Sequence, residues 1–463
     1  MELNLSFLGA ADGVTGSKTL LEFNKFKCLI DCGLFQGPKL VRDQNRQPFP
    51  LPPEKIDQII LTHAHLDHSG YLPKIVREGY SGDIFCSKGT KDIGEILLRD
   101  AAYLEEEFAK FANDTRYSHH FPAEPLFTQA DAEAAIAKMK GFDRNIWHTL
   151  ESGVSFRFIQ AGHIVGASSV QIKFENEFHT KLLCFSGDLG HGRSFVLNAP
   201  EIGMEADHLV LEGTYGNRNH SPENALNAFA DVFMRTYNRG GVLVIPAFAV
   251  GRAQEITYMI RLLENTGRIP KIPVILDSPM SVAAMDIYLD HVEDRKSSLR
   301  DIRKQDFVPE KFEISKTPDQ SMLTCMRDGP IVVISASGML SGGRILHHLK
   351  HRLPNEKNTV LFCGYQAEGT KGRVLQESMG VLKSIRIHHQ EVNIEAEIAT
   401  MDHLSAHADQ SELLAWIASM KKKPKSIIVN HGEPEAQKAL AKLIEKDLSI
   451  KCYCAHEQKQ FHF

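Results

Sequence analysis

The chain has 463 residues, which is too long for one ordinary hydrophobic core, so we expect two domains. Hydrophobic residues make up 43% and charged residues 24% of the sequence, a balance that excludes disordered and fibrous proteins and predicts a soluble globular one. The formal net charge of −5 excludes an overall positive field. Any binding of nucleic acid must therefore come from a local basic cleft.

Cysteine usage and the N-terminus indicate the compartment. The eight cysteines are scattered through apolar, strand-like runs and lack the spacing of a disulfide framework, so we expect reduced core residues. The N-terminus alternates as a strand from Met1 to Phe7 and shows no secretory signal, and no apolar run reaches membrane-spanning length. These patterns predict a cytoplasmic protein without membrane contact.

Short strands dominate the chain up to about residue 211, with histidines and aspartates just past their ends. The clearest of these strands are expected at residues 27–30, 58–61, 154–159, 170–174 and 181–185. Two stretches, 91–112 and 130–140, have apolar residues at helical spacing and are expected to cover the periphery.

From about residue 213 the rhythm changes to strand, glycine-containing loop, helix and strand, which is typical of a doubly wound parallel sheet. Its elements are expected at residues 242–246, 252–263, 274–276, 282–289, 331–335, 344–350 and 360–363. After about residue 400 the sequence again becomes rich in histidine, as in the first part of the chain. Helices are expected there near 410–420 and 434–446, and a strand at 426–429. We therefore expect residues 1–212 and 400–463 to form one domain, and residues 213–399 to form another.

The strongest chemical signal is a cluster of metal-ligand residues that directly follows an apolar strand. A tight loop at a strand end can turn three imidazoles and a carboxylate toward one point, and this donor set suits zinc. The alternative is a histidine-rich surface loop, since the chain has 22 histidines. Four ligand-type residues within six positions favour the metal site. The residues are His63, His65, Asp67 and His68.

Three further ligand-type residues have the same placement at strand ends. His163, Asp188 and His431 each follow an apolar run and are flanked by glycine. These residues are further candidates for the same metal site.

In this order, the motifs resemble those of the metallo-β-lactamase superfamily. The resemblance implies an α/β fold, an αββα sandwich, and two zinc ions. It assigns one zinc to His63, His65 and His163, the other to Asp67, His68 and His431, and the bridging position to Asp188. Asp31 would orient ligands from behind without binding metal.

Two adjacent metal ions suit the hydrolysis of phosphodiesters, because together they activate the attacking water and stabilise charge on the phosphoryl and leaving oxygens. Zinc also lowers the pKa of a bound water toward ~7, so no protein nucleophile is required.

The doubly wound segment resembles the β-CASP domain, which is inserted in a branch of this superfamily made up of nucleases. Residues 211–216, 405–409 and 430–433 are similar to the A, B and C motifs of that family, although Gly213 stands where relatives often have serine. A histidine at motif C is typical of the members that process RNA, so the resemblance implies a single-stranded RNA substrate. Residues 337–344 and 364–370 are similar to the group that contains the endonuclease subunit of the cleavage and polyadenylation specificity factor.

The same motifs supply a candidate general acid. An alkoxide is a poor leaving group, so a positioned acid contributes ~10²–10⁴ in rate. The family match favours His407 for this role, with Glu212 holding it protonated. The alternative is that His407 caps the helix that begins near Gln410. Asp67, Glu212 and His407 are thus the expected catalytic residues.

Small and basic residues at strand ends of the second domain are candidates for binding RNA phosphates. Plain tight turns are an equally good explanation of each position taken alone. We expect the scissile phosphate between the domains, with the second domain gripping a neighbouring phosphate. The candidates are Ser335, Ser337, Gly338, Arg344, Lys371 and Arg373.

Three functions remain in competition. The first is an RNA endonuclease that can also act as an exonuclease in RNA processing or decay. The second is a metallo-hydrolase of DNA or of another ester, and the third is a catalytically silent RNA-binding scaffold. The large β-CASP-like insert argues against the second function, and the presence of every expected ligand argues against the third, so the first is favoured. A homodimer is compatible with the sequence.

Overall fold

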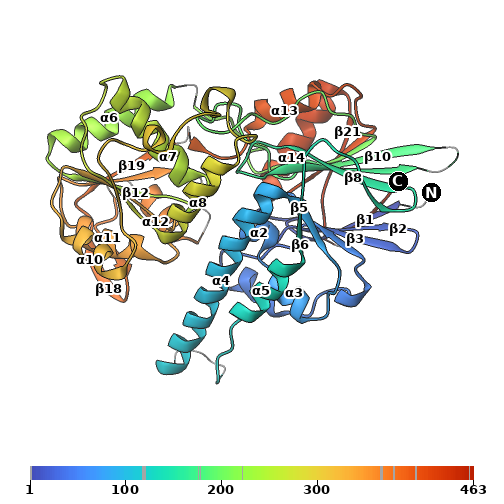
Figure 1. Cartoon of the computed structure of the whole chain (residues 1–463), viewed down its shortest axis with the longest axis horizontal. Helices are drawn as coiled ribbons and strands as arrows, with labels where there is room; N and C mark the ends of the chain where they lie inside the picture. The colour runs from blue at the N-terminus through green and yellow to red at the C-terminus, as the bar shows by residue number, and fades with distance from the viewer. Residues whose placement is uncertain are drawn as a thin grey trace. The chain divides into compact units, whose positions relative to one another are not determined.

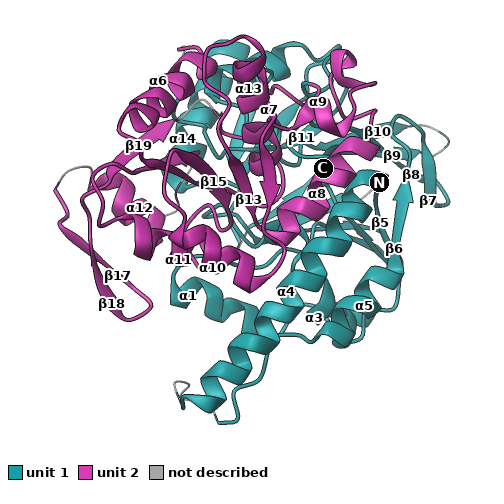
Figure 2. Cartoon of the chain, turned by 60° about the vertical axis from the view of Figure 1, so that its left-hand side comes forward, with its two compact units in different colours: residues 1–192, 199–219, 407–463 teal, residues 193–198, 220–406 magenta. Residues whose placement is uncertain are grey.

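The computed structural model describes residues 3–116, 121–175, 177, 179–221, 223–364, 366, 369–378, 381–401, 404–457 and 459–463. The chain forms two compact units, which Figure 2 colours separately. Unit 1 comprises residues 1–192, 199–219 and 407–463, and unit 2 comprises residues 193–198 and 220–406. No helix in the described ranges is both long enough and apolar enough to span a bilayer.

Unit 1 contains two seven-stranded sheets. The first has the order β22 (Gln460–His462), β1 (Leu3–Gly9), β2 (Lys18–Phe23), β3 (Phe26–Ile30), β4 (Gln58–Ile60), β5 (Ile84–Ser87) and β6 (Met139–Phe142). The second has the order β21 (Lys451–Cys454), β20 (Ser426–Asn430), β11 (His208–Glu212), β10 (Thr180–Phe185), β9 (Ser168–Glu175), β8 (Val154–Gln160) and β7 (His148–Glu151).

The two sheets pack face to face around one apolar core. In β1, Leu5 and Phe7 are buried while Asn4 and Ser6 are partly exposed, the period of two expected of a strand with one face on a core. Leu5 and Phe7 belong to the same buried cluster as Phe156 of β8 in the other sheet. Burial of such large apolar side chains is the main force that joins the layers.

Helices cover the outer faces of this sandwich. A second apolar cluster joins the first sheet to α3 (Leu72–Arg77), α4 (Lys88–Asp114) and α5 (Gln129–Lys138). On the second sheet, α14 (Pro434–Leu443) lies against β20 and β21. Figure 1 shows the helices outside the two sheets, which confirms the expected αββα sandwich.

Unit 2 is built on a six-stranded sheet whose pairings are all parallel. The residues of its inner strands are buried throughout, as expected of a sheet covered on both faces. The strand order is β14 (Phe312–Ile314), β13 (Val274–Asp277), β15 (Ile331–Ser335), β12 (Val242–Pro246), β16 (Thr359–Cys363) and β19 (Glu397–Met401). From β12 the chain moves out to β13 and β14 before it returns to β15 beside β12, which is the doubly wound order expected.

The helices of unit 2 lie before β12 or between the strands of the sheet along the chain. The longer ones are α6 (Ala225–Asn238), α7 (Arg252–Asn265), α8 (Pro279–Asp290), α10 (Pro318–Met326), α11 (Arg344–Arg352) and α12 (Lys371–Glu377). Leu346 and Leu349 of α11 and Leu375 of α12 join the apolar core of the sheet.

Residues 193–198 form a short strap that belongs to unit 2 although the sequence on both sides belongs to unit 1. The carboxylate of Glu255, at the start of α7, accepts hydrogen bonds from the Ser194 hydroxyl (2.9 Å) and the Phe195 amide (2.5 Å). Val196 and Leu197 are buried. The strap is therefore held as firmly as a core segment.

Candidate metal centre

The first group of candidate ligands is placed by two neighbouring parallel strands. Strand β3 pairs with β4 so that Ile30 lies opposite Ile60. The residues that follow these strands therefore leave the sheet at the same edge. Asp31 follows β3, and residues 63–68 follow β4 as a tight loop that enters α2 (Leu66–Ser69).

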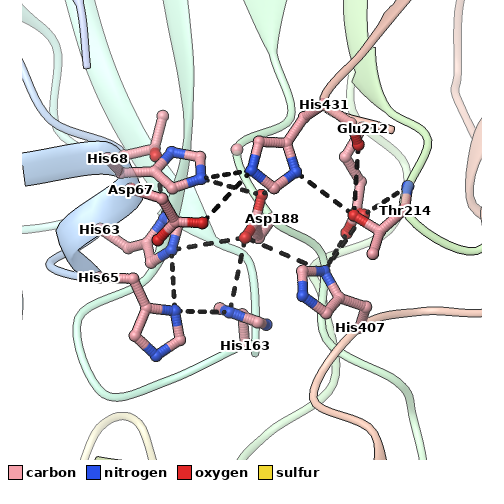
Figure 3. A network of polar contacts seen from close by, with 12 residues as sticks. His63, His65, Asp67, His68, His163, Asp188, Glu212, Thr214, His407 and His431 are labelled. Atoms are coloured by element: carbon pink, nitrogen blue, oxygen red, sulfur yellow. Dashed lines mark hydrogen bonds and ion pairs between the residues drawn. The ribbon is translucent and has the colours of Figure 1, made fainter. Parts of the chain in front are cut away.

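The second group comes from the other sheet. His163 lies in the turn between β8 and β9, and Asp188 follows β10. Strands β11 and β20 are parallel, with Glu212 opposite Asn430. His431, the residue after Asn430, therefore lies at the same edge of the sheet as Glu212. The facing edges of the two sheets thus bring all seven candidate ligands together, as Figure 3 shows.

The ligand atoms form two clusters that share one carboxylate. His63, His65 and His163 form the first cluster with Asp188, and Asp67, His68 and His431 form the second. Asp188 Oδ2 lies 3.5 Å from His63 Nε2 and 3.6 Å from His163 Nε2. Its other oxygen, Oδ1, lies 3.4 Å from His68 Nε2 and 3.5 Å from His431 Nδ1. Asp188 therefore lies between histidines of both clusters.

The contacts between these rings fit bound metal better than a hydrogen-bond network. His65 Nδ1 lies 3.2 Å from His63 Nε2 and 3.1 Å from His163 Nε2, and His68 Nε2 lies 3.0 Å from His431 Nε2. A neutral imidazole offers one donor and one lone pair, so such convergence leaves lone pairs facing each other. Asp188 Oδ1 is also buried and accepts no hydrogen bond from the described residues. Divalent zinc would satisfy these atoms.

Burial controls the charge of the first cluster. It lowers the pKa of His63 well below the ordinary value and lowers the pKa of His65 to about 4. Burial works against ionisation of Asp188, but the positive charges of His431 and His68 lower the pKa of this carboxyl well below its usual range. Neutral imidazoles around an ionised carboxylate are the form in which these side chains bind zinc.

Asp31 supports the site from behind. Its carboxylate accepts hydrogen bonds from the Thr62 amide (2.7 Å) and hydroxyl, and lies 2.7 Å from His68 Nδ1. Burial lowers the pKa of His68, but the charges of Asp188 and Asp31 outweigh it and raise that pKa well above the ordinary value. The contact fixes the ring so that Nε2 points toward Asp188 and His431.

His407 lies next to the clusters and beside Glu212, whose carboxylate oxygens are 3.2 and 3.3 Å from His407 Nδ1. Glu212 is buried and also accepts from the Leu189 amide at 2.7 Å. Burial lowers the pKa of His407, but Glu212 and Asp188 raise it to about 9. The alternative that His407 caps the next helix is wrong, because Asp409 is the N-cap of α13 (Gln410–Ala418).

Thr214 is a contact that the sequence motifs did not reveal. Its hydroxyl lies 3.3 Å from His431 Nδ1 and donates to the His431 carbonyl. Its only signal in the sequence is its place two residues after Glu212.

Comparison with known proteins agrees with this geometry. A profile of the metallo-β-lactamase superfamily matches residues 12–232, one of the Beta-Casp domain matches residues 253–375, and one of the Zn-dependent metallo-hydrolase RNA specificity domain matches residues 391–455. Ribonuclease TTHA0252 of Thermus thermophilus is 37% identical over 94% of this chain and 94% of its own length. The chain belongs to the β-CASP family of the metallo-β-lactamase superfamily.

Other relatives in the β-CASP family are longer. The transcription termination factor FttA of Methanocaldococcus jannaschii is 28% identical over 93% of this chain and 67% of its own length. A crystal structure of a protein of unknown function from Enterococcus faecalis V583 matches 100% of both chains with a TM-score of 0.56 at 13% identity. That likeness supports the fold alone.

The candidate phosphate contacts lie in unit 2, which we call the β-CASP unit. They differ in how many hydrogen bonds and ion pairs their side chains already make. Ser335 is buried, and its hydroxyl donates to the Asp277 carbonyl. Arg344 donates to the Asp277 carboxylate (2.8 Å) and to the Ser315 carbonyl (2.8 Å). Among the described residues, the Arg373 side chain pairs at the surface with Glu377 (2.6 Å).

The remaining three candidates lie at chain turns of the β-CASP unit. The Ser337 hydroxyl is 2.9 Å from that of Ser341, and Gly338 packs so closely on Phe248 that a Cβ would lie 3.0 Å from the Phe248 amide nitrogen. Lys371 begins α12. Within the motif at 364–370, residues Tyr365, Ala367 and Glu368 lie outside the described residues.

Asp277 is a second contact that the sequence analysis missed. It is fully buried at the end of β13, 2.6 Å from His348 Nε2, and accepts from the Ser321 hydroxyl (2.6 Å) and Arg344. Burial raises the pKa of this carboxyl, but the three donors outweigh burial and lower it. The sequence feature that could have revealed Asp277 is its position directly after the apolar run Val274-Ile275-Leu276.

Proposed function

We propose that this chain is a zinc-dependent ribonuclease that hydrolyses phosphodiester bonds of single-stranded RNA. The observation that carries the proposal is the pair of ligand clusters that share Asp188. Further support comes from the ribonuclease of Thermus thermophilus, a relative of this chain, and from the RNA specificity profile over residues 391–455. Cleavage within the strand is the expected activity, with exonuclease activity as an addition.

The residues of each cluster would hold one zinc ion. The first would bind to His63, His65 and His163, and the second to Asp67, His68 and His431. Asp188 would bind both. When bound, two zinc ions supply the Lewis acidity that activates water and stabilises negative charge on the phosphoryl oxygens.

His407 is the proposed general acid. The Glu212 carboxylate engages Nδ1 of the ring, so the ring stays oriented and charged. Nε2 would then give its proton to the leaving oxygen of the ribose. Glu212 acts through His407 and is in turn held by the Leu189 amide, so it works as a positioning residue.

The β-CASP unit would contact the RNA backbone. Ser337, Gly338, Lys371 and Arg373 are the proposed phosphate contacts, because a phosphate can replace the surface partner of Arg373 at little cost. Arg344 would act indirectly, because its guanidinium is held by buried Asp277.

The direct test uses single-stranded RNA and DNA, each labelled at the 5′ or the 3′ end, with zinc-loaded protein. Short internal products from RNA, absent with chelator and restored by added zinc, are expected. Cleavage of DNA at an equal rate would contradict the substrate assignment. Binding of RNA without cleavage by fully loaded protein would make the chain a scaffold instead.

A second test concerns the acid. His407→Ala should keep both zinc ions but slow cleavage of RNA by ~10²–10⁴-fold, and should slow a nitrophenyl phosphodiester far less because its leaving group needs no proton. Exposed His462, on β22, offers a matched control as His462→Ala. Equal losses with both substrates would exclude His407 as the acid.

A further inference from the structure

The second half of α4 exposes an unusual amount of apolar surface. Tyr103 is 51%, Leu104 56%, Phe108 60% and Phe111 51% exposed. Figure 1 shows this end of the helix extending beyond α3 and α5, its neighbours in unit 1. Isolated exposed apolar residues are common, but a contiguous group of this size marks an interaction surface.

The spacing shows that these side chains form a stripe. Leu104, Phe108 and Phe111 are related by four and three residues, which places them on one face of the helix. Ala102 and Ala109, on the opposite face, are buried against the body of unit 1. The helix therefore has two apolar faces, and the fold of unit 1 uses only one of them.

Charges along the stripe argue against RNA as its ligand. Exposed aromatic rings can stack on bases, but a nucleic acid also needs positive charge beside them. The helix instead carries the exposed carboxylates of Glu107 and Asp114 on this side, with Lys110 as the one basic residue between Tyr103 and Asp114. Repulsion between these carboxylates and phosphates would disfavour an RNA strand on this face.

The stripe also carries a pair of opposite charges. Glu107 lies between Tyr103 and Phe111, four residues from each, and Lys110 neighbours Glu107 three residues further on; both charged side chains are exposed. If a second copy packs antiparallel across a two-fold axis, Lys110 of each copy meets Glu107 of the other. An isologous contact of this kind requires a surface that complements itself.

We propose that the stripe formed by Tyr103, Leu104, Phe108 and Phe111 is a dimer interface that pairs α4 with α4 of a second copy of this chain. Each half-exposed side chain offers on the order of 100 Å², so the apolar side chains of both copies bury roughly 800 Å² in total, which is below the ~1,200 Å² of a standard specific interface and in the range of weak ones. Glu107 and Lys110 add to this area. A weak dimer, in equilibrium with monomer, is the consequence.

The test is sedimentation velocity of the full chain from nanomolar to high micromolar concentration. Wild type should shift from monomer to dimer, and Phe108→Glu should weaken the dimer by ~30-fold or more. The matched control is Leu40→Glu, which alters a side chain that is 85% exposed on α1 (Lys39–Arg42). RNA cleavage and zinc content should stay unchanged in both variants, so this result is independent of the proposed function.

A charge exchange tests the arrangement itself. Glu107→Lys and Lys110→Glu should each weaken the dimer by about tenfold, because like charges then meet across the axis. The double variant should regain the dimer, since it restores opposite charges in reversed order.

Several outcomes would overturn the proposal. They are a wild-type chain that stays monomeric at every concentration, a dimer that tolerates Phe108→Glu, and a double charge variant that fails to recover. Loss of RNA affinity in Phe108→Glu would instead make the stripe part of the RNA path.

Discussion

Gly190 lies where the two ligand loops of the second sheet come closest, and we predict that Gly190→Ala disables the metal centre. A Cβ at Gly190 would lie 2.0 Å from the Gly162 carbonyl oxygen and 2.9 Å from the His163 amide nitrogen. Real Cβ atoms essentially never come closer than 3.0 Å to another heavy atom, so the loops must separate by about 1 Å. Gly190 also pairs with His407, which would move with it.

The size of the effect follows from that displacement. A misplacement of 1 Å at a catalytic group costs roughly 10²-fold in rate, and overpacking costs about 1–3 kcal/mol in stability. Gly190→Ala should therefore lose ~100-fold in kcat on RNA and should bind the zinc shared by His163 and Asp188 more weakly. The melting temperature should fall only modestly. Steady-state cleavage, elemental analysis and thermal unfolding measure the three effects.

Gly192, two residues further along the same loop, provides the control. A Cβ there would meet only the Ala199 Cβ, at 4.0 Å, so Gly192→Ala should behave as wild type. If Gly190→Ala matched Gly192→Ala in both rate and zinc content, the close approach would have no functional role and the reasoning would be refuted.

Three further predictions concern single side chains. His431→Ala should lose mainly the zinc held with Asp67 and His68, so elemental analysis should fall from two ions per chain toward one. Asp277→Asn should cost ~3–5 kcal/mol in urea unfolding because it removes the buried carboxylate that partners Arg344 and the fully buried His348. Because folding lowers the pKa of Asp277, wild type should lose this stabilisation as the pH falls below about 4, whereas the variant should show no such loss. Arg373→Ala should weaken RNA binding for all sequences and reduce its salt dependence by about one phosphate contact, and unchanged binding would remove Arg373 from the RNA path.

The sequence predicts the family and the fold well because both depend on local patterns. Residues 63–68 form a motif within one loop, and the change from isolated strands to an alternation of strand and helix marks the second fold. The sandwich, the parallel sheet and the family are confirmed.

The sequence patterns do not predict the direction in which individual side chains point. Ser335 and Arg344 stand at a strand end and a helix start, where phosphate contacts are common, yet both turn toward Asp277. Asp409, not His407, caps α13, and the sequence alone cannot decide between two polar residues so close to the same helix start. Such choices depend on partners that are distant in the sequence, such as Asp277 for Ser335 and Arg344 and Glu212 for His407.

The strap at residues 193–198 bears on how freely the β-CASP unit can be exchanged. Deleting residues 220–406, or grafting that stretch from a relative, would leave Val196 and Leu197 without the interior that buries them. Ser194 and Phe195 would lose Glu255 as their common acceptor. Residues 193–198 would then form an exposed apolar segment a few residues after Asp188. A chimera therefore needs residues 193–198 and residues 220–406 from the same donor. An evolutionary transfer of residues 220–406 alone would have damaged the chemistry of its host.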